Sequence, residues 1–385
     1  MGHAGPGLRS EPCLRLPRRP RHEQGETRPR HSPASHAPLR ARPDLGVVSR
    51  GGSRHPPRGL RIRGPAPRHA RRVTAPTILV YHPEEARDYA RLIRLPRRGA
   101  TVVACATPAE ADAVIAEAEI LYGWGVPAAL LARAARLRWI QCMGAGVERF
   151  LVPEVPAGVT ITRAAGIFGP WMAEYVLGWS LWVTQRMETF RQRQRERRWV
   201  GEHPARLHGA TICIIGLGDI GRAIARSARS FAMTVVGVSR SGRRVREASA
   251  VYRTSAMRRA LARADFVVVT LPLTDETRGL IGAAELSAMK PSAWLINIAR
   301  GQVVEEAPLV KALSEHRIGG AILDVFEREP LPPEHPLWSL HNAVITPHIS
   351  GPSTPDEIAV IFNDNLRRYL SGRPLRHVVS RRRGY

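Results

Sequence analysis

The chain has 385 residues, which is enough for two domains of ordinary size that each bury a hydrophobic core. Its hydrophobic content of 44% is normal for a globular protein. No stretch approaches the roughly 18 apolar residues that cross a bilayer, which argues against a membrane protein. The positive charges behind the net charge of +25 are almost all arginine, because lysine occurs only at Lys290 and Lys311.

The four cysteines lie far apart, and no two of them form a Cys-x-x-Cys pair; they are Cys13, Cys105, Cys142 and Cys213. This spacing predicts neither a zinc site nor a disulfide framework. It fits a reducing compartment. We therefore expect a cytoplasmic protein without a bound metal.

Residues 1–72 contain 17 Arg and 4 acidic residues, a surplus of 13 positive charges. The segment is rich in Pro, Gly and Arg and has no apolar periodicity, so it cannot bury enough surface to offset the cost of ordering. We predict a disordered basic tail, and we favour an over-extended gene start with translation beginning near Val73. A nucleic-acid-binding arm and an organelle transit peptide are the alternatives. We expect no nucleic acid and no membrane among the partners.

Strand-like and helical segments alternate from Thr77 onward, which predicts a parallel α/β sheet. The helical stretches include 108–117 and 127–135, and a long one covers about 170 to 198. The expected strands of this first series are 77–82, 101–106, 119–124 and 138–143.

A second series follows, and its near-continuous apolar runs suit strands covered by helices on both faces. Beyond Pro355 we expect one more amphipathic helix, with its apolar side chains at helical spacing: Ile358, Ile361, Phe362, Leu366 and Tyr369. The expected strands of the second series are 211–215, 234–239, 266–270, 294–298, 321–326 and 343–346.

A Gly-x-Gly-x-x-Gly motif directly follows the strand at 211–215 and opens a helix, as in dinucleotide-binding units. Gly216 permits a tight turn, Gly218 lets the backbone approach a pyrophosphate, and Gly221 allows the helix to pack closely on the strand. Backbone N–H groups and the helix dipole then face the phosphates. The expected inner face of the helix is Ile220, Ile224, Ala228 and Phe231.

The end of the next strand indicates which dinucleotide binds. An NAD site usually has an Asp or Glu there, whereas this chain has Ser239, Arg240, Ser241, Arg243 and Arg244, with no carboxylate before Glu247. Guanidinium groups can pair with a 2′-phosphate, so the segment favours NADPH, although NAD stays possible. The alternative is that these arginines are a solvated face of an arginine-rich protein.

Three further segments carry polar residues at predicted strand ends: 295–301 with Arg300, 324–330 with Glu329, and 346–348 with His348. Together with the glycine motif and the segments 144–148, 173–175 and 271–279, in this order, they resemble the D-isomer-specific 2-hydroxyacid dehydrogenase family. The resemblance covers about Thr77 to Val379.

The resemblance implies that a hydride moves between NAD(P)H and a small 2-oxo acid or D-2-hydroxy acid. His348 would donate the proton, Glu329 would orient the imidazole and raise its pKa, and Arg300 would bind the substrate. Backbone amides of Ala145 and Gly146 would complete the carboxylate pocket. Asp324 would contact the nicotinamide end. The full set of expected cofactor contacts is Gly216, Gly218, Asp219, Ile220, Gly221, Ser239, Arg240, Pro272, Ile298 and Asp324.

The resemblance also implies two doubly wound parallel-sheet domains. We expect a flavodoxin-like substrate domain over 77–171 plus 349–379, a Rossmann cofactor domain over 172–348, and a homodimer. The missing ribose-reading acid matches the NADPH-using branch that reduces glyoxylate- or hydroxypyruvate-like substrates. Glu148 replaces the aspartate common in its loop, which could alter the geometry of that loop.

Two other functions stay open from the sequence. One is an NAD(P)-sensing regulator on the same scaffold, because a fold does not fix a function. The other is a nucleic-acid-binding protein that acts through its basic arm. The side chains of Trp124 and Trp171 border the substrate pocket or belong to the core.

Overall fold

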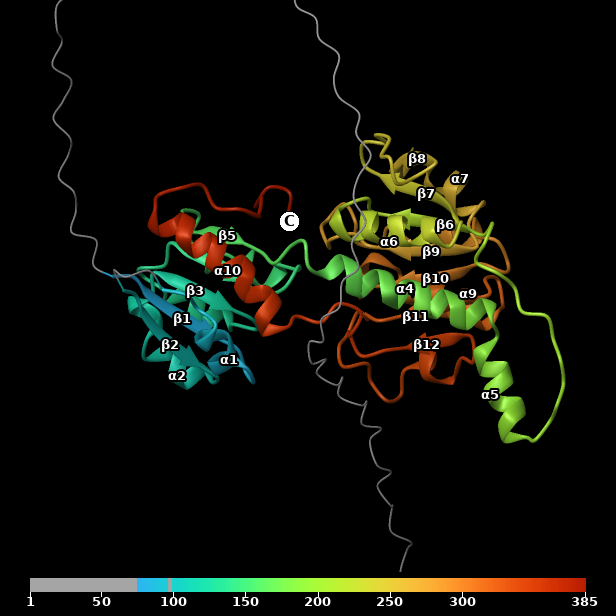
Figure 1. The fold of residues 1–385 in the computed structure, drawn as a ribbon, viewed down its shortest axis with the longest axis horizontal. Coiled ribbons are helices and arrows are strands. Elements are labelled where there is room, and N and C mark those ends of the chain that lie inside the picture. The colour runs from blue at the N-terminus through green and yellow to red at the C-terminus, as the bar shows by residue number, and fades with distance from the viewer. Residues whose placement is uncertain (1–74, 96–98) are drawn as a thin grey trace, which may run out of the picture. The chain divides into compact units, whose positions relative to one another are not determined.

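The computed structural model describes residues 75–95 and 99–385, so the predictions for residues 1–72 lie outside the described part of the chain. Within the described residues, the strands form one five-stranded and one seven-stranded sheet, and every strand runs parallel to its neighbours (Figure 1). The prediction of an α/β protein with two parallel sheets is confirmed.

The first sheet has the order β2-β1-β3-β4-β5, which is the flavodoxin-like order. The expected strands are present, and a short edge strand at Thr160–Thr162 was not predicted. The strands are β1 Thr77–Tyr81, β2 Thr101–Cys105, β3 Ile120–Gly123, β4 Trp139–Cys142 and β5 Thr160–Thr162. The helices that follow them are α1 Ala86–Arg91, α2 Pro108–Asp112, η1 Ile115–Glu117, α3 Ala128–Ala132 and η2 Glu148–Phe150.

Helix α10, Pro355–Leu370, comes from the far end of the chain and packs on the first sheet (Figure 1). The Phe362 ring stacks on Tyr122 at 4.1 Å and on Trp139 at 5.3 Å between ring centroids. The buried Asn365 amide donates to Gln141 Oε1 at 3.2 Å. The predicted C-terminal helix therefore completes the core of a sheet whose strands begin almost 280 residues earlier.

The second sheet has the order β12-β11-β10-β9-β6-β7-β8, so the strand order reverses between β6 and β9. This is the Rossmann arrangement, in which ligands bind beyond the carboxyl ends of the strands at the reversal. Its strands are β6 Thr211–Ile215, β7 Thr234–Ser239, β8 Ala250–Arg253, β9 Phe266–Val269, β10 Trp294–Asn297, β11 Gly320–Leu323 and β12 Ala343–Ile345. Strand β8, at the edge, was not predicted.

Two predictions about the helices of this part were wrong. The single helix expected from about 170 to 198 is two helices, because Arg186 has a φ of 53° and breaks the helical path. Phe231 does not belong to the inner face of the glycine-motif helix, since it ends that helix and is 40% exposed. The helices are α4 Phe168–Thr184, α5 Met187–Arg195, α6 Asp219–Ser230, η3 Thr254–Ala256, α7 Met257–Leu261, α8 Ala283–Ser287, η4 Gly301–Val303, α9 Glu306–Ser314 and η5 Pro336–Ser339.

The two sheets have separate hydrophobic clusters on their faces. Phe168, at the start of α4, packs with the first sheet, whereas Ala173 and Val176, one turn and more later, pack with the second. The boundaries predicted at 171 and 349 stay a prediction. Among the helices of residues 75–95 and 99–385, none is long and apolar enough to cross a membrane.

Candidate active site

The glycine motif forms a tight turn between β6 and α6. Gly216 has a φ of +106°, a conformation that side chains other than glycine rarely adopt. A Cβ at Gly221 would overlap the carbonyl oxygen of Gly216, so the helix can approach the strand only with glycine there. A Cβ at Gly218 would instead point into open space at the N-terminus of α6. This open cradle lies beside the first N–H groups of α6, which have no partner within the helix itself, and it fits a dinucleotide pyrophosphate.

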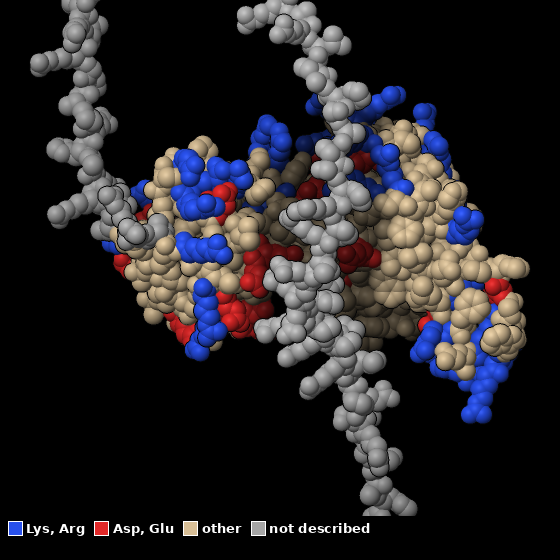
Figure 2. All heavy atoms as spheres, viewed as in Figure 1, with Lys and Arg blue, Asp and Glu red and all other residues tan. Residues whose placement is uncertain are grey.

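A cavity of about 380 Å³ lies beside the end of β7. Three arginines give it a positive lining, together with two serines, and Figure 2 shows basic side chains gathered over β7 and β8. The lining residues are Leu217, Arg222, Ser239, Ser241, Arg243, Arg244 and Val245. Such a lining fits an anionic group such as a ribose 2′-phosphate.

Arg240 does not line this cavity, although the sequence singled it out. Its guanidinium lies 3.4 Å from Glu276 Oε2 and donates to the Tyr385 hydroxyl at 3.2 Å. The sequence analysis did not predict Arg222 as a lining residue. The one feature that could have indicated it is its place on the first turn of α6. Gly242, with a φ of +65°, turns the chain between Arg240 and Arg243.

The other expected cofactor residues lie around the same strand ends. The Asp219 carboxylate accepts the Gly166 N–H at 2.9 Å, and Ser239 Oγ accepts the Gly242 N–H at 3.2 Å. Ile220 and Pro272 are half-buried, whereas the Ile298 side chain is buried in the core. Only the backbone of Ile298 could therefore face a ligand.

His348 and Glu329 form a pair in which the histidine Nδ1 lies 2.8 Å from Glu329 Oε2. The side chains are 46% and 37% exposed, so a ligand can reach them. Partial burial raises the pKa of Glu329, but hydrogen bonds from His348 and from the Phe326 N–H outweigh it and leave the pKa below its ordinary value. Arg300 lowers it further through its charge. Glu329 is therefore a carboxylate at neutral pH.

Asp324 is completely buried and holds the loop that carries His348. One carboxylate oxygen accepts the Thr346 hydroxyl at 2.6 Å and the Ile349 N–H at 2.8 Å. The other accepts the Ser350 N–H at 2.9 Å. His348 lies between these anchors with a φ of 54°, a strained conformation for a residue other than glycine. The predicted contact of Asp324 with nicotinamide stays a prediction.

Arg300 follows β10 and its turn lies close to the Glu329 loop. A Cβ at Gly301 would overlap the backbone of Phe326, so glycine permits this approach. Asn297 fixes the turn, because its side chain donates to the Arg300 carbonyl at 3.1 Å and accepts the Ala299 N–H at 3.1 Å. The structure thus brings Arg300, Glu329 and His348 together.

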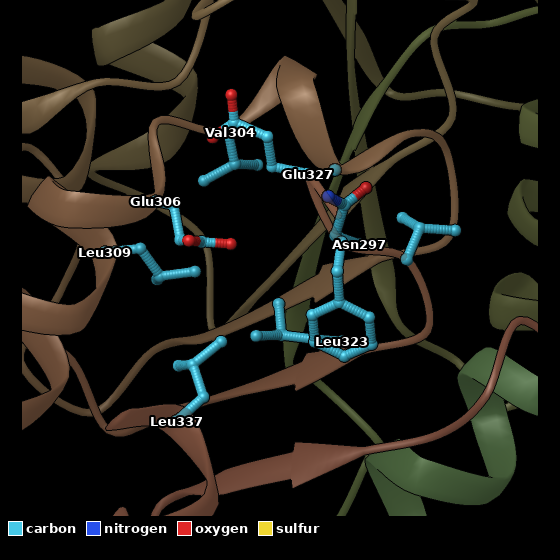
Figure 3. A pocket seen from close by; sticks show the side chains of 10 residues that line it. Asn297, Val304, Glu306, Leu309, Leu323, Glu327 and Leu337 are labelled. Atoms are coloured by element: carbon cyan, nitrogen blue, oxygen red, sulfur yellow. The ribbon is translucent and has the colours of Figure 1, made fainter. Parts of the chain in front are cut away.

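A second cavity lies behind the Arg300 turn, and Figure 3 shows Asn297, Glu306 and Glu327 among the side chains around it. Its volume of about 10 Å³ is the space of about one water molecule. It is therefore too small for a substrate.

The loop after β4 faces Arg300. Burial raises the pKa of the Cys142 thiol to about 12, so the thiol stays protonated and donates to the Gly146 carbonyl at 3.2 Å. Among the described residues, the N–H groups of Ala145 and Gly146 have no acceptor. They are therefore available to a bound carboxylate.

The two tryptophans that the sequence left open are both half-exposed. The Trp124 ring packs so closely on Gly144 that a Cβ there would overlap it. Trp124 thus borders the loop after β4. The Trp171 indole N–H instead points to the Glu357 carboxylate, at 3.3 Å from Oε2.

Comparison with known proteins assigns the chain to a family. Residues 177–350 match the D-isomer specific 2-hydroxyacid dehydrogenase, NAD binding domain. The chain is 32% identical over 270 residues to glyoxylate/hydroxypyruvate reductase A of Photorhabdus laumondii, and the match covers 68% of this chain and 86% of the relative. The chain belongs to the D-isomer specific 2-hydroxyacid dehydrogenase family.

Solved structures agree with this assignment. A D-isomer specific 2-hydroxyacid dehydrogenase family protein from Aeromonas salmonicida is 37% identical, with a TM-score of 0.74 over 80% of this chain and 100% of that one. An NADPH-dependent glyoxylate/hydroxypyruvate reductase from Sinorhizobium meliloti, in complex with NADP and sulfate, is 30% identical, with a TM-score of 0.75 over 81% and 100%.

As a 2-hydroxyacid dehydrogenase, the protein is an NAD(P)-dependent oxidoreductase. Its described residues include an imidazole beside a carboxylate, a guanidinium, two backbone N–H groups without an acceptor, and a glycine turn open to a phosphate. These can hold a small carboxylate and move a proton at its carbonyl oxygen.

Proposed function

We propose that this dehydrogenase is an NADPH-dependent reductase of small 2-oxo acids of the glyoxylate or hydroxypyruvate kind. The observation that carries the proposal is the His348–Glu329 pair beside Arg300. The names of the similar reductases support the substrate class. The reaction converts a 2-oxo acid and NADPH, with one proton, into a D-2-hydroxy acid and NADP.

Each residue of the site has a separate role in the proposed reduction. When bound, NADPH supplies the hydride for the carbonyl carbon. His348 donates the proton to the carbonyl oxygen from Nε2, because its Nδ1 is bonded to Glu329. Glu329 stabilises the imidazolium and fixes its orientation. Arg300, with the amides of Ala145 and Gly146, binds the carboxylate and polarises the carbonyl.

The preference for NADPH rests on the arginine-lined cavity beside β7. Losing one charge-assisted contact to a phosphate costs about 1.5–3 kcal/mol, so Arg243→Ala should raise the KM for NADPH about ten- to a hundred-fold. The KM for NADH should change little, since NADH lacks the 2′-phosphate. Arg258→Ala removes the same charge from an exposed position outside the cavity and serves as the control. Equal turnover of NADPH and NADH by the native protein would refute this preference.

The chemistry is tested with an NADPH-oxidation panel over glyoxylate, hydroxypyruvate, pyruvate, phenylpyruvate and branched 2-oxo acids. His348→Ala should reduce kcat about 10²- to 10⁴-fold, the loss typical of a general acid, while NADPH binding persists. If no 2-oxo acid in the panel is reduced, the proposed function is wrong. If His348→Ala keeps full activity, the assignment of the proton donor is wrong.

We also propose that the protein is a homodimer, as its family resemblance implies. Every residue of α5 is exposed or only partly buried, and four apolar side chains in and after this helix are exposed: Met187, Phe190, Trp199 and Val200. A second copy of the chain is the partner expected to cover them. Light scattering should give a dimer mass, and Trp199→Arg should shift the protein toward the monomer.

A further inference from the structure

Glu148 forms an ion pair with Arg300, the residue expected to bind the substrate carboxylate. Arg300 Nε lies 3.2 Å from Glu148 Oε1, and Nη2 lies 3.4 Å from Oε2. The two carboxylate oxygens thus face one edge of the guanidinium side-on. The third nitrogen, Nη1, donates to the Ala299 carbonyl at 2.6 Å. All three nitrogens of Arg300 are therefore engaged with the chain itself.

The backbone fixes Glu148 in this place. Val147 before it and Phe150 after it are both buried in the hydrophobic cluster of the first sheet. Gly146 leaves room for the pair, because a Cβ there would overlap Arg300 Nη2 and lie 2.7 Å from Glu148 Oε2. An aspartate at position 148 would be one methylene shorter, so its carboxylate would not extend as far from this turn.

Glu148 occupies the edge of Arg300 formed by Nε and Nη2, which is one of the two edges that can bind a carboxylate in a bidentate manner. A substrate carboxylate that binds this edge displaces the Glu148 carboxylate from it. Because Glu148 follows Gly146 by two residues, the displaced carboxylate stays tethered close to the amides expected to hold the substrate carboxylate. There it repels a second negative charge on a ligand.

We propose that Glu148 is a specificity-determining residue: its carboxylate competes with the substrate carboxylate for Arg300 and disfavours 2-oxo acids that carry a second carboxylate. This inference rests on the proposed function. It predicts that Glu148 raises the KM for a 2-oxo monocarboxylate without lowering kcat, because the pair exists only before the substrate binds.

The test compares Glu148→Gln, which removes the charge at nearly constant volume, with the native protein and with Glu154→Gln. Glu154 is exposed six residues later, makes no ion pair with the described residues, and controls for the loss of one negative charge. Partly exposed ion pairs contribute about 0.2–1 kcal/mol, so the KM for glyoxylate should fall by up to about five-fold in Glu148→Gln. The KM for oxaloacetate should fall by a larger factor, and kcat should stay within about two-fold.

Binding of oxamate to the NADPH-loaded protein, measured by calorimetry, separates this inference from the proposed function. Glu148→Gln should bind oxamate several-fold more tightly, and Glu148→Asp should lie between it and the native protein. An unchanged or weaker oxamate affinity in Glu148→Gln overturns the inference, and so does an equal gain in Glu154→Gln. Failure of the native protein to reduce any 2-oxo acid overturns the proposed function instead.

Discussion

Asp324→Asn should both destabilise the protein and slow the reaction, because the buried carboxylate anchors the His348 loop. The substitution keeps the volume but replaces one acceptor oxygen with an N–H₂ donor. If Oδ1 keeps its hydrogen bonds from Thr346 and Ile349, the new side-chain NH₂ group faces the Ser350 N–H. Both of these groups are donors, so no hydrogen bond can form between them. One hydrogen bond to a charged group is lost, at about 1.5–3 kcal/mol.

The two remaining bonds to Asp324 weaken as well, because they lose their charge-assisted character. The free energy of unfolding should therefore fall by about 2–4 kcal/mol, which lowers Tm by roughly 3–6 °C for a folded body of about 310 residues. The strained φ of His348 can then relax, and a misplacement of about 1 Å costs on the order of a hundred-fold in kcat.

The assays are thermal unfolding and NADPH oxidation at a saturating 2-oxo acid. Asp265→Asn is the matched control, since Asp265 lies in the same sheet at the amino end of β9 and also accepts a backbone N–H, from Thr211 at 2.7 Å. This variant should keep the native kcat. Equal effects on Tm from both variants, with kcat unchanged in each, would refute the anchoring role. A weaker NADPH affinity with native Tm would assign Asp324 to the cofactor instead.

Three further predictions follow from the same structure. The lowered pKa of Glu329 means that its ionised form stabilises the folded protein above the ordinary value of 4.5, and that this contribution disappears as the pH falls through the folded pKa. Because the side chain is 37% exposed, Glu329→Gln should cost at most about 1 kcal/mol at pH 7, and thermal unfolding should show no difference between the two proteins once the pH lies below the folded-state pKa of Glu329. Gly221→Ala should abolish NADPH binding, measured by fluorescence titration, because its Cβ overlaps the Gly216 carbonyl; native affinity would contradict the described turn. Deletion of residues 1–72 should leave Tm and kcat unchanged, because their sequence has no apolar periodicity. A Tm lower by several degrees would contradict the prediction that this segment does not contribute to stability.

The sequence predicted those parts of the fold whose signals are local. The buried strands of both sheets have continuous apolar runs, and the glycine turn follows one of them directly. Strands β5 and β8 were missed because both are short edge strands. Three of the four residues of β8 are only partly buried, so its apolar signal is weak. The break at Arg186 was missed because nothing in its residue type requires a positive φ.

Site residues were predictable where one strand end or one turn defines their place. The turn at Gly242 decides which arginine faces the cavity beside β7. Amino-acid composition alone does not reveal the direction in which this turn sends the chain. The Arg300–Glu148 pair joins residues 152 positions apart, so no local pattern encodes it. Sequence reasoning noticed that Glu148 is unusual in its loop but gave it no partner.

The position of α10 has a consequence for how the chain folds as it is synthesised. The strands of the second sheet lie consecutively between Thr211 and Ile345, so this part holds all its core residues before α10 leaves the ribosome. The first sheet begins at Thr77 but leaves Tyr122 and Trp139 without the Phe362 ring until residue 362 is made. The part synthesised first therefore acquires its complete core last, and its exposed aromatic face needs protection from aggregation during translation.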